Sequence, residues 1–396
     1  MSNPKSPLPT VSNKRLRILL VSVLDRADHP RIAAKEAKTL SSAYDCTICA
    51  AGLSNDIKKI DGIDYLLLPP VSVRSFRRIL RVFELIRIIR QQKPDVLHLH
   101  SIELLLPVGL FCSRPSMLVF YDRHEDYSRN IRYGNHIHPW FRKPLSWLVN
   151  LHERAMAKKL HGIIYAESSF QGRLPVPEAK TVVVRNTYQG NRQPDAKPIS
   201  SSQNDIPILL YSGTIAEEWG ALRCIEFWKF WCLKSKAILQ FVGPCFSPRL
   251  KEEIWRKVRN SPFPEAFEWP GNGDRVSYQQ IEQAISECSF GLALYQVTLA
   301  RADRVPARFY EYMAWQKPLV FSNHPPWDAM NTRIGFGISM PDQEPLSEEV
   351  ERVREAFLQG FPTCFQNPLP AKNWHWSTDG QALMRFYEQQ ITLQRR

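Results

Sequence analysis

The run RLRILLVSV, residues 15–23, decides the fold class of this chain. A continuous apolar run that ends in a polar loop is typical of a strand buried on both faces, as in a parallel sheet. The segment 29–45 that follows places Ile32, Ala37 and Leu40 near one helical face. A second apolar run, YDCTICAAG, comes directly after it at 44–52. Strand, helix and strand in this order predict a right-handed α/β unit.

The same alternation continues to about residue 190, which predicts a doubly wound, Rossmann-like first domain over residues 15–190 after a disordered tail at 1–14. The segment 182–207 then loses its apolar pattern and is rich in Pro, Ser, Asn and Gln. Such a composition favours a linker, which we place at 191–206. The further strands expected in this domain are 96–100, 117–122, 162–167 and 181–184.

The apolar pattern restarts at ILLYSG, 208–213, and predicts a second Rossmann-like domain over residues 207–375. A final helix is expected at 376–396, with Leu383, Phe386 and Tyr387 on one side. Two α/β domains of similar size should face each other across a cleft, and ligands should bind there at the carboxyl ends of the strands. The elements expected in this domain are strands at 208–213, 237–243, 289–295 and 318–323, and helices at 221–233 and 307–315.

Composition and absent motifs exclude several classes of protein. The longest apolar stretch, 102–112, is too short to span a membrane, which takes about 20 residues, and no secretory signal precedes the first strand. The eight cysteines are scattered over 396 residues, so we expect buried thiols, including Cys46 and Cys49, in a reducing cytoplasm. The sequence has no GxxxxGK[ST], no GxGxxG after the first strand, no GxSxG and no HExxH, which disfavours P-loop kinases, nicotinamide dehydrogenases and common hydrolases.

Positive charge is confined to the first half of the chain. Residues 1–190 contain 29 Lys and Arg against 16 Asp and Glu, whereas residues 191–396 contain 23 of each. The segments 74–94 and 135–162 combine basic and aromatic residues. They are either packed helices with solvated edges or a face that docks electrostatically on an anionic membrane near an acceptor, with most of the Phe and Ile stripe of 74–94 packed on the sheet. Nucleic-acid binding is not favoured, because no such motif is present. The residues assigned to this acceptor or membrane contact are Arg74, Arg77, Arg78 and Arg81.

The block RADRVPARFYEYMAWQKPLVFSN, 301–323, carries the most specific chemistry. Pro306 should open a helix, whose free N–H groups and positive dipole end suit a phosphate. The interleaved Arg301, Arg304 and Arg308 offer bidentate donors to phosphate oxygens, although they could also simply solvate a helix surface. The carboxylate of Glu311 can accept hydrogen bonds from two ribose hydroxyls. The block therefore predicts a nucleotide-diphosphate site.

This block resembles a segment of the GT-B glycosyltransferases of family 4, and other motifs agree in order over about residues 15–390. KPDVLHLH (93–100), FYDRHEDY (120–127), ILLYSGTIAEEWGALRCIE (208–226) and NWHWSTDGQALMRFYEQQ (373–390) each resemble a family motif. The resemblance implies the GT-B fold, with the last helix crossing back to the first domain. It implies a retaining, metal-independent glycosyltransferase that moves a sugar from a nucleotide-diphosphate sugar to a glycan or lipid-linked acceptor in cell-surface polysaccharide synthesis. Such an enzyme needs no cofactor beyond its donor substrate, and it would work in the cytoplasm or peripherally on the inner face of the membrane.

The family motifs also imply roles for single residues. Glu311 would hold the donor ribose, Asp303 would lie near the donor sugar, and His124 would bind that sugar near the reacting carbon. Arg308 would neutralise the diphosphate and share this task with Arg304. By this comparison the catalytic residues are His124, Asp303 and Arg308, and the donor is bound by Gly213, Thr214, Arg304, Arg308 and Glu311.

Departures from the family keep two alternatives open. The family often has basic residues near Thr214 and Trp219, and neither position is basic here. A non-catalytic GT-B scaffold or binding protein therefore remains possible, and so does a sugar-nucleotide 2-epimerase, which shares the fold. His98 and His100 lie on one face of a strand, but no third ligand is evident beside them, so no metal site is expected.

Overall fold

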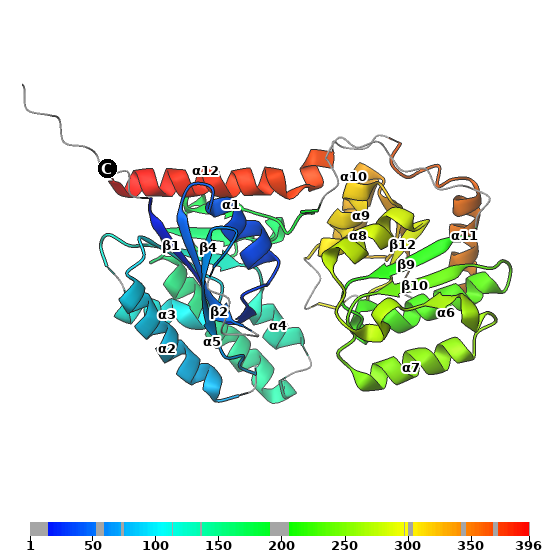
Figure 1. The fold of residues 1–396 in the computed structure, drawn as a ribbon, viewed down its shortest axis with the longest axis horizontal. Helices are drawn as coiled ribbons and strands as arrows, with labels where there is room; N and C mark the ends of the chain where they lie inside the picture. Colours follow the sequence, from blue (N-terminus) through cyan, green and yellow to red (C-terminus); the bar gives the residue numbers. More distant parts are fainter. Residues whose placement is uncertain are drawn as a thin grey trace, which may run out of the picture.

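The computed structural model describes residues 15–52, 59–72, 75–112, 114–134, 137–190, 206–296, 298–299, 304–341, 346–366 and 371–395. Two sheets, one in each half of the chain, lie side by side (Figure 1). All their strand pairs are parallel except the antiparallel pair β3–β4 at the edge of the first sheet. The predicted tail and most of the predicted linker lie outside the described residues.

The first sheet has eight strands in the order β3-β4-β2-β1-β5-β6-β7-β8. The apolar run that opens the sequence forms the central strand β1, which pairs in parallel with β2 and β5. The strands are β1 (Arg17–Arg26), β2 (Asp45–Ala51), β3 (Lys59–Ile60), β4 (Ile63–Leu68), β5 (Val96–Leu99), β6 (Leu118–Arg123), β7 (Gly162–Tyr165) and β8 (Thr181–Val183). The longer helices are the π-helix η1 (Arg31–Ala37), which continues into α1 (Lys38–Leu40), and α2 (Arg77–Gln92), α3 (Leu105–Phe111), α4 (Tyr127–Tyr133) and α5 (Pro139–Ala157).

Helices cover both faces of this sheet. On one face, residues of α2, α3 and α5 pack on the strands in a core that includes Leu85, Val108 and Met156. On the other face, η1, α1 and the last helix, α12 (Trp376–Arg395), pack on the strands through residues such as Ile32 and Phe386. Because both faces are covered, the strands are apolar on both sides, as the sequence predicts.

The second sheet has six strands in the order β11-β10-β9-β12-β13-β14. Its strands are β9 (Ile208–Ser212), β10 (Ile238–Val242), β11 (Phe267–Glu268), β12 (Phe290–Ala293), β13 (Leu319–Ser322) and β14 (Gly337–Met340). Its helices are α6 (Ala221–Cys232), α7 (Pro248–Arg259), α8 (Tyr278–Glu287), α9 (Ala307–Trp315), α10 (Pro325–Ile334) and α11 (Leu346–Leu358). Two aromatic-rich cores cover its two faces, one built around α6 and one around α9.

Helix α12 returns from the second half of the chain to the first sheet and runs along its upper side in Figure 1. The buried carboxylate of Asp379 accepts hydrogen bonds from the backbone and guanidinium of Arg185 and from the hydroxyl of Thr187. The hydroxyl of Tyr387 lies 2.6 Å from Nδ1 of His98 in β5. These contacts confirm a C-terminal helix that crosses back to the first domain.

Most of the helices and strands expected from the sequence begin and end within two residues of their observed bounds. The helix expected at 307–315 has these bounds, and Leu383, Phe386 and Tyr387 are buried together. All eight cysteines are free thiols, and burial raises the pKa of Cys46 and Cys49 to about 12. Within the described ranges, no helix has the length and apolarity that crossing a bilayer would require.

Candidate functional site between the two domains

A cavity of about 240 Å³ lies between the two domains, where loops after the carboxyl ends of strands from both sheets meet. The first domain contributes loops after β1, β6, β7 and β8, and the second contributes loops after β9, β12 and β13. This is the position that the doubly wound topology predicts for a ligand. Its polar and aromatic lining includes His29, His124, Glu125, Glu167, Asn186, Trp219, Tyr295, Arg304, His324 and Trp327.

His124 follows β6 and is held beside a buried carboxylate. Its Nδ1 lies 3.6 Å from Oδ2 of Asp122, and its side chain is 17% exposed. Burial works to lower the pKa of His124, but the charge of Asp122, together with Asp25 and Glu125, raises that pKa above its ordinary value. The structure thus brings this predicted sugar-binding residue to the cavity, with a negative charge behind it.

Glu167, which the sequence analysis did not single out, follows β7 and lines the same cavity. Its Oε1 accepts a hydrogen bond of 3.2 Å from the backbone N–H of Val305, across the two domains. Burial raises the pKa of Glu167 to about 8, despite the opposing effects of this hydrogen bond and of nearby arginines. Glu167 is therefore mostly protonated at neutral pH.

Arg304 lines the cavity but is already paired across the domains. Its guanidinium donates to both carboxylate oxygens of Glu125 and, at 2.9 Å, to the side-chain oxygen of Asn130. Its backbone carbonyl accepts from the indole N–H of Trp327 at 2.7 Å. As it stands, Arg304 holds the two domains together, so a diphosphate would have to compete with Glu125 for it.

Arg308 lies buried in the first turn of α9, against the loop after β9. Its guanidinium carbon lies 4.5 Å and 5.1 Å from the ring centroids of Tyr211 and Tyr295. A Cβ built on Gly213 would lie 3.1 Å from Nη2 of Arg308, and Gly213 has a φ of +85°, so both space and backbone conformation favour glycine there. Nη1 of Arg308 is buried without a hydrogen-bond partner. The structure thus brings together Arg308, Gly213 and the adjoining Thr214, whose carbonyl accepts from the hydroxyl of Tyr211.

Glu311 lies one turn further along α9 and faces groups from both domains. Its Oε1 accepts a 3.3 Å hydrogen bond from Tyr278 in α8. Burial raises the pKa of Glu311, while the charges of Lys35 and Arg308 oppose that rise. Lys35 comes from η1 in the first domain, and burial lowers its pKa to about 7. The family often has basic residues near positions 214 and 219, and this chain has none at either position. Lys35 is a basic side chain in this region that sequence reasoning missed.

The remaining predicted residues have different surroundings. Asp303, Arg301 and Arg74 lie outside the described residues. Arg77 is exposed, whereas Arg78 pairs with Glu103. Arg81 is only 4% exposed and bonds to Glu84 and to the carbonyl of Pro69, so it does not present its charge to solvent. The prediction of four surface arginines is therefore wrong for Arg81, because α2 turns this side chain inward.

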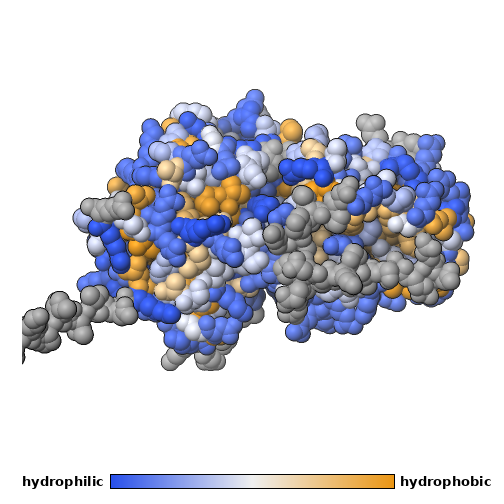
Figure 2. Space-filling model, turned by 90° about the horizontal axis from the view of Figure 1, so that it is seen from above, coloured by the Kyte–Doolittle hydropathy of each residue, from blue (hydrophilic) through white to orange (hydrophobic). Residues whose placement is uncertain are grey.

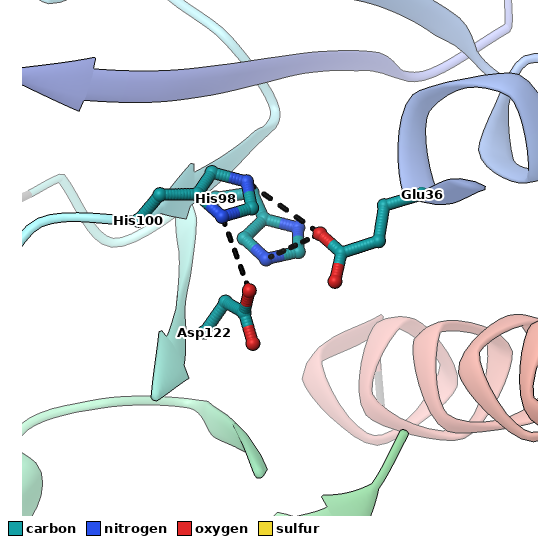
Figure 3. A group of neighbouring side chains, drawn as sticks. All are labelled: Glu36, His98, His100 and Asp122. Carbon is teal, nitrogen blue, oxygen red and sulfur yellow. Dashed lines mark hydrogen bonds and ion pairs between the residues drawn. The ribbon is translucent and has the colours of Figure 1, made fainter. Parts of the chain in front are cut away.

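A buried polar network lies behind His124 and consists of Glu36, His98, His100 and Asp122 (Figure 3). The Nε2 atoms of His98 and His100 point toward Oε2 of Glu36, at 3.6 Å and 3.5 Å. Nδ1 of His100 lies 3.1 Å from Oδ2 of Asp122. The sequence analysis found no third ligand beside the two histidines, but the structure supplies two carboxylates from distant parts of the chain.

These four residues could hold a metal ion, since each offers one ligand atom and the four atoms lie within 4.8 Å of one another. However, Arg31 already donates two 2.7 Å hydrogen bonds to Asp122 and lies 3.0 Å from Oε1 of Glu36. Burial raises the pKa of Glu36 well above its usual value, and the charge of Asp122 adds to this rise. This rise favours the protonated form of Glu36, in which Arg31 and Asp122 balance each other and the network is neutral without an ion.

Comparisons with known proteins identify the fold. Residues 17–117 match the model of a family described as Glycosyl transferase 4-like. No curated protein sequence matches the chain. Among solved structures, the chain is similar to sucrose-phosphate synthase from Thermosynechococcus elongatus, with a TM-score of 0.70 and 10% identity, over 96% of this chain and 100% of that one.

Two further solved structures are similar to the chain over most of its length. HepE from Anabaena in complex with UDP-glucose matches with a TM-score of 0.62 and 10% identity, over 94% of this chain and 99% of that one. AviGT4, a glycosyltransferase involved in avilamycin A biosynthesis, matches with a TM-score of 0.56 and 15% identity, over 95% and 98% of the two chains. The chain therefore has the GT-B fold, and its residues 17–117 resemble the family described as Glycosyl transferase 4-like.

With Glu36 protonated and Asp122 ionised, two isosteric substitutions in the buried network should have different effects on the free energy of unfolding. Asp122→Asn leaves Arg31 without its counter-ion and should lower the free energy of unfolding by about 3–5 kcal/mol. Glu36→Gln should cost much less, because a protonated carboxyl is already neutral. Since the raised pKa makes folded Glu36 hold its proton more tightly than unfolded Glu36, wild type should lose stability as pH rises above about 4.5, toward the folded-state pKa of Glu36.

The measurement is urea unfolding of wild type and both variants at pH 5 and pH 8. The Glu36→Gln variant should gain stability relative to wild type between these two values. Equal losses for Glu36→Gln and Asp122→Asn at both pH values would show that Glu36 is ionised, as an ion-pair partner or a metal ligand.

Proposed function

We propose that this chain is a retaining, metal-independent glycosyltransferase that binds a nucleoside-diphosphate sugar in the cavity between its domains. The observation that carries the proposal is the convergence there of His124 from the first sheet with the start of α9 from the second. Helix α9 brings a buried arginine with a free Nη1 atom and a carboxylate one turn later. Structures of HepE, which shares this fold, contain UDP-glucose or UDP with glucose.

The proposed chemistry requires little more than charge stabilisation. A departing nucleoside diphosphate concentrates negative charge, which preorganised donors stabilise most effectively in a buried site. Arg308 and the N-terminal amides of α9 would receive that charge, with Lys35 supplying a further cation from the first domain. Glu311 would hold the ribose hydroxyls, and His124 would bind the sugar. The leaving phosphate would take the proton of the acceptor on the same face of the sugar, which retains the anomeric configuration.

We further propose that the acceptor is a glycan or a lipid-linked saccharide in cell-surface polysaccharide synthesis, and that the chain works in the cytoplasm or at the inner face of the membrane. The basic first domain supports an acceptor with anionic groups or an anionic membrane surface nearby. An assay of products separates this function from the two alternatives. Nucleoside diphosphate released only with acceptor indicates transfer, an epimeric sugar nucleotide indicates an epimerase, and binding without any product indicates a scaffold.

The role of Glu311 is tested by Glu311→Ala. Loss of two charge-assisted hydrogen bonds, each worth about 1.5–3 kcal/mol, should weaken nucleotide binding at least about tenfold. Glu287→Ala is the matched control, because Glu287 is an exposed glutamate on the neighbouring helix α8. Calorimetry with the donor nucleotide gives both affinities, and thermal unfolding checks the fold. An affinity unchanged in Glu311→Ala would remove this residue from the donor site.

The raised pKa of Glu167 predicts the pH dependence of donor binding. Below about pH 8 Glu167 is protonated, so it adds no negative charge beside a diphosphate. As pH rises through about 8, its ionisation should repel the donor, and affinity should fall. Lys35, with a pKa of about 7, loses its charge over a lower range and weakens binding in the same direction.

The Glu167→Gln variant separates these two effects. Donor affinity measured from pH 6 to pH 9 should lose its decline near pH 8 in this variant but keep the decline near pH 7. If the two pH profiles coincide, Glu167 does not face the bound diphosphate.

A further inference from the structure

The outer surface of the layer formed by α2, α3 and α5 is rich in exposed apolar side chains. Among the described residues, thirteen of the twenty-three exposed large hydrophobic residues belong to this layer. A soluble monomer rarely exposes so many contiguous apolar side chains, and large patches mark sites of protein or membrane contact. The thirteen residues, called the apolar face below, are Phe76, Ile79, Leu80, Phe83, Leu106, Leu110, Phe111, Trp140, Phe141, Leu145, Trp147, Leu148 and Leu151.

Helix α2 has two apolar sides, and only one of them packs on the sheet. Leu85, Ile86 and Ile89 are buried in the core beneath the helix. Phe76, Ile79, Leu80 and Phe83 recur at helical spacing on the opposite side and are 51–72% exposed. The expectation that most of the Phe and Ile stripe of this segment packs on the sheet is therefore wrong for its first four members.

Helix α5 continues the apolar face with two exposed tryptophans. Trp140 and Trp147 are 84% and 62% exposed, and Leu148 and Leu151 follow on the same side. On its inner side, α5 buries Met156 in the core. The two sides of α5 thus contrast in the same way as those of α2.

The short helix α3 contacts both α2 and α5. Side chains of α2 and α3 also line a groove of about 350 Å³, with Ile79, Phe83, Leu106 and Leu110 in its walls. The α2 and α3 parts of the apolar face are therefore continuous across this groove, and α5, which contacts α3, carries the rest of the face.

The charges that flank the apolar face are nearly all positive. Helix α2 exposes Arg77, Arg87 and Arg90, and its one acidic residue, Glu84, pairs with Arg81. In α5, the one acidic residue, Glu153, is buried and paired with Arg123. The basic residues exposed on or just after α5 are Lys143, Arg154, Lys158 and Lys159.

We propose that the apolar face inserts into the interface of a bilayer that contains anionic phospholipid. Tryptophan and phenylalanine side chains favour the boundary between headgroups and acyl chains, and flanking Lys and Arg are attracted to anionic headgroups. A second copy of the chain fits this surface poorly, because a two-fold interface would bring its like charges together. This contact differs from purely electrostatic docking, because most of its free energy comes from buried apolar area and resists salt.

The proposed membrane contact does not involve the opposite side of the first domain. Helix α12 lies on the side of the sheet opposite α2, α3 and α5 (Figure 1). Figure 2 looks onto that opposite side, where hydrophilic residues cover most of the visible surface. The inference deepens the proposed location at the inner face of the membrane, and it does not depend on the proposed transferase activity.

The test is co-sedimentation of the full chain with vesicles of phosphatidylcholine alone or with phosphatidylglycerol added, at low and high salt. Binding should be stronger with phosphatidylglycerol, and a clear fraction should remain bound at high salt and on neutral vesicles. The triple variant Phe83→Ser, Trp140→Ser, Trp147→Ser should weaken the partition coefficient at least about tenfold. The matched control Leu233→Ser, Phe246→Ser, Leu358→Ser removes equally exposed apolar residues from the second domain and should bind like wild type.

A second readout reports insertion itself. Vesicles with bromine on the acyl chains should quench the fluorescence of the bound chain, and this quenching should decrease in Trp140→Phe, Trp147→Phe while binding persists. Three results would overturn the proposal: complete release by salt, equal binding by the triple variant, or a dimer in solution that the triple variant dissociates. Loss of sugar transfer with normal vesicle binding would count against the proposed function alone.

Discussion

The arrangement of the first domain depends on the buried ion pair between the guanidinium of Arg31 and the carboxylate of Asp122. The guanidinium joins η1 to the end of β6 through Asp122 and to the chain after β8 through the carbonyl of Val184. A buried arginine needs its counter-ion, since an unpaired charge in the core costs several kcal/mol. Arg31 and Asp122 therefore fix each other, and Asp122 in turn lies beside His124 at the cavity. The position of the proposed sugar-binding histidine thus follows from an ion pair behind it.

The two domains are joined by polar contacts around the same cavity. Arg304 pairs with Glu125, and the N–H of Val305 donates to Glu167, so the segment before α9 is held by the first domain. Outside the cavity lining, Asp379 of α12 binds Arg185 at the exit from the first domain. The cavity is therefore bordered by contacts that a bound donor could replace, which suits a site that exchanges substrate and product.

The sequence predicted the fold well, because buried parallel strands and amphipathic helices follow local periodicity. Runs such as 15–23 and 208–213 are apolar enough to identify their strands, and the block 301–323 predicts helix α9 with Arg308 and Glu311. Contacts between distant residues were not predictable in this way. Nothing near Lys35 or Glu36 in the sequence shows that they face Glu311 and the two histidines, because these contacts depend on how η1 packs. The same limit applies to α2. Because this helix has apolar residues on two sides, its sequence does not show which side packs on the sheet or that Arg81 is buried.

Binding of a nucleoside-diphosphate sugar in the cavity between the domains can be measured directly by a thermal-shift screen. UDP-, GDP-, ADP- and CMP-sugars would each be added to the full chain in large excess. A ligand at 100 times its dissociation constant adds about 2.7 kcal/mol to the stability of the folded state. We expect a clear rise in Tm with sugars of one nucleoside diphosphate, and a smaller rise after Glu311→Ala. If no sugar nucleotide stabilises the chain at millimolar concentration, the cavity is not a donor site and the proposed function is contradicted.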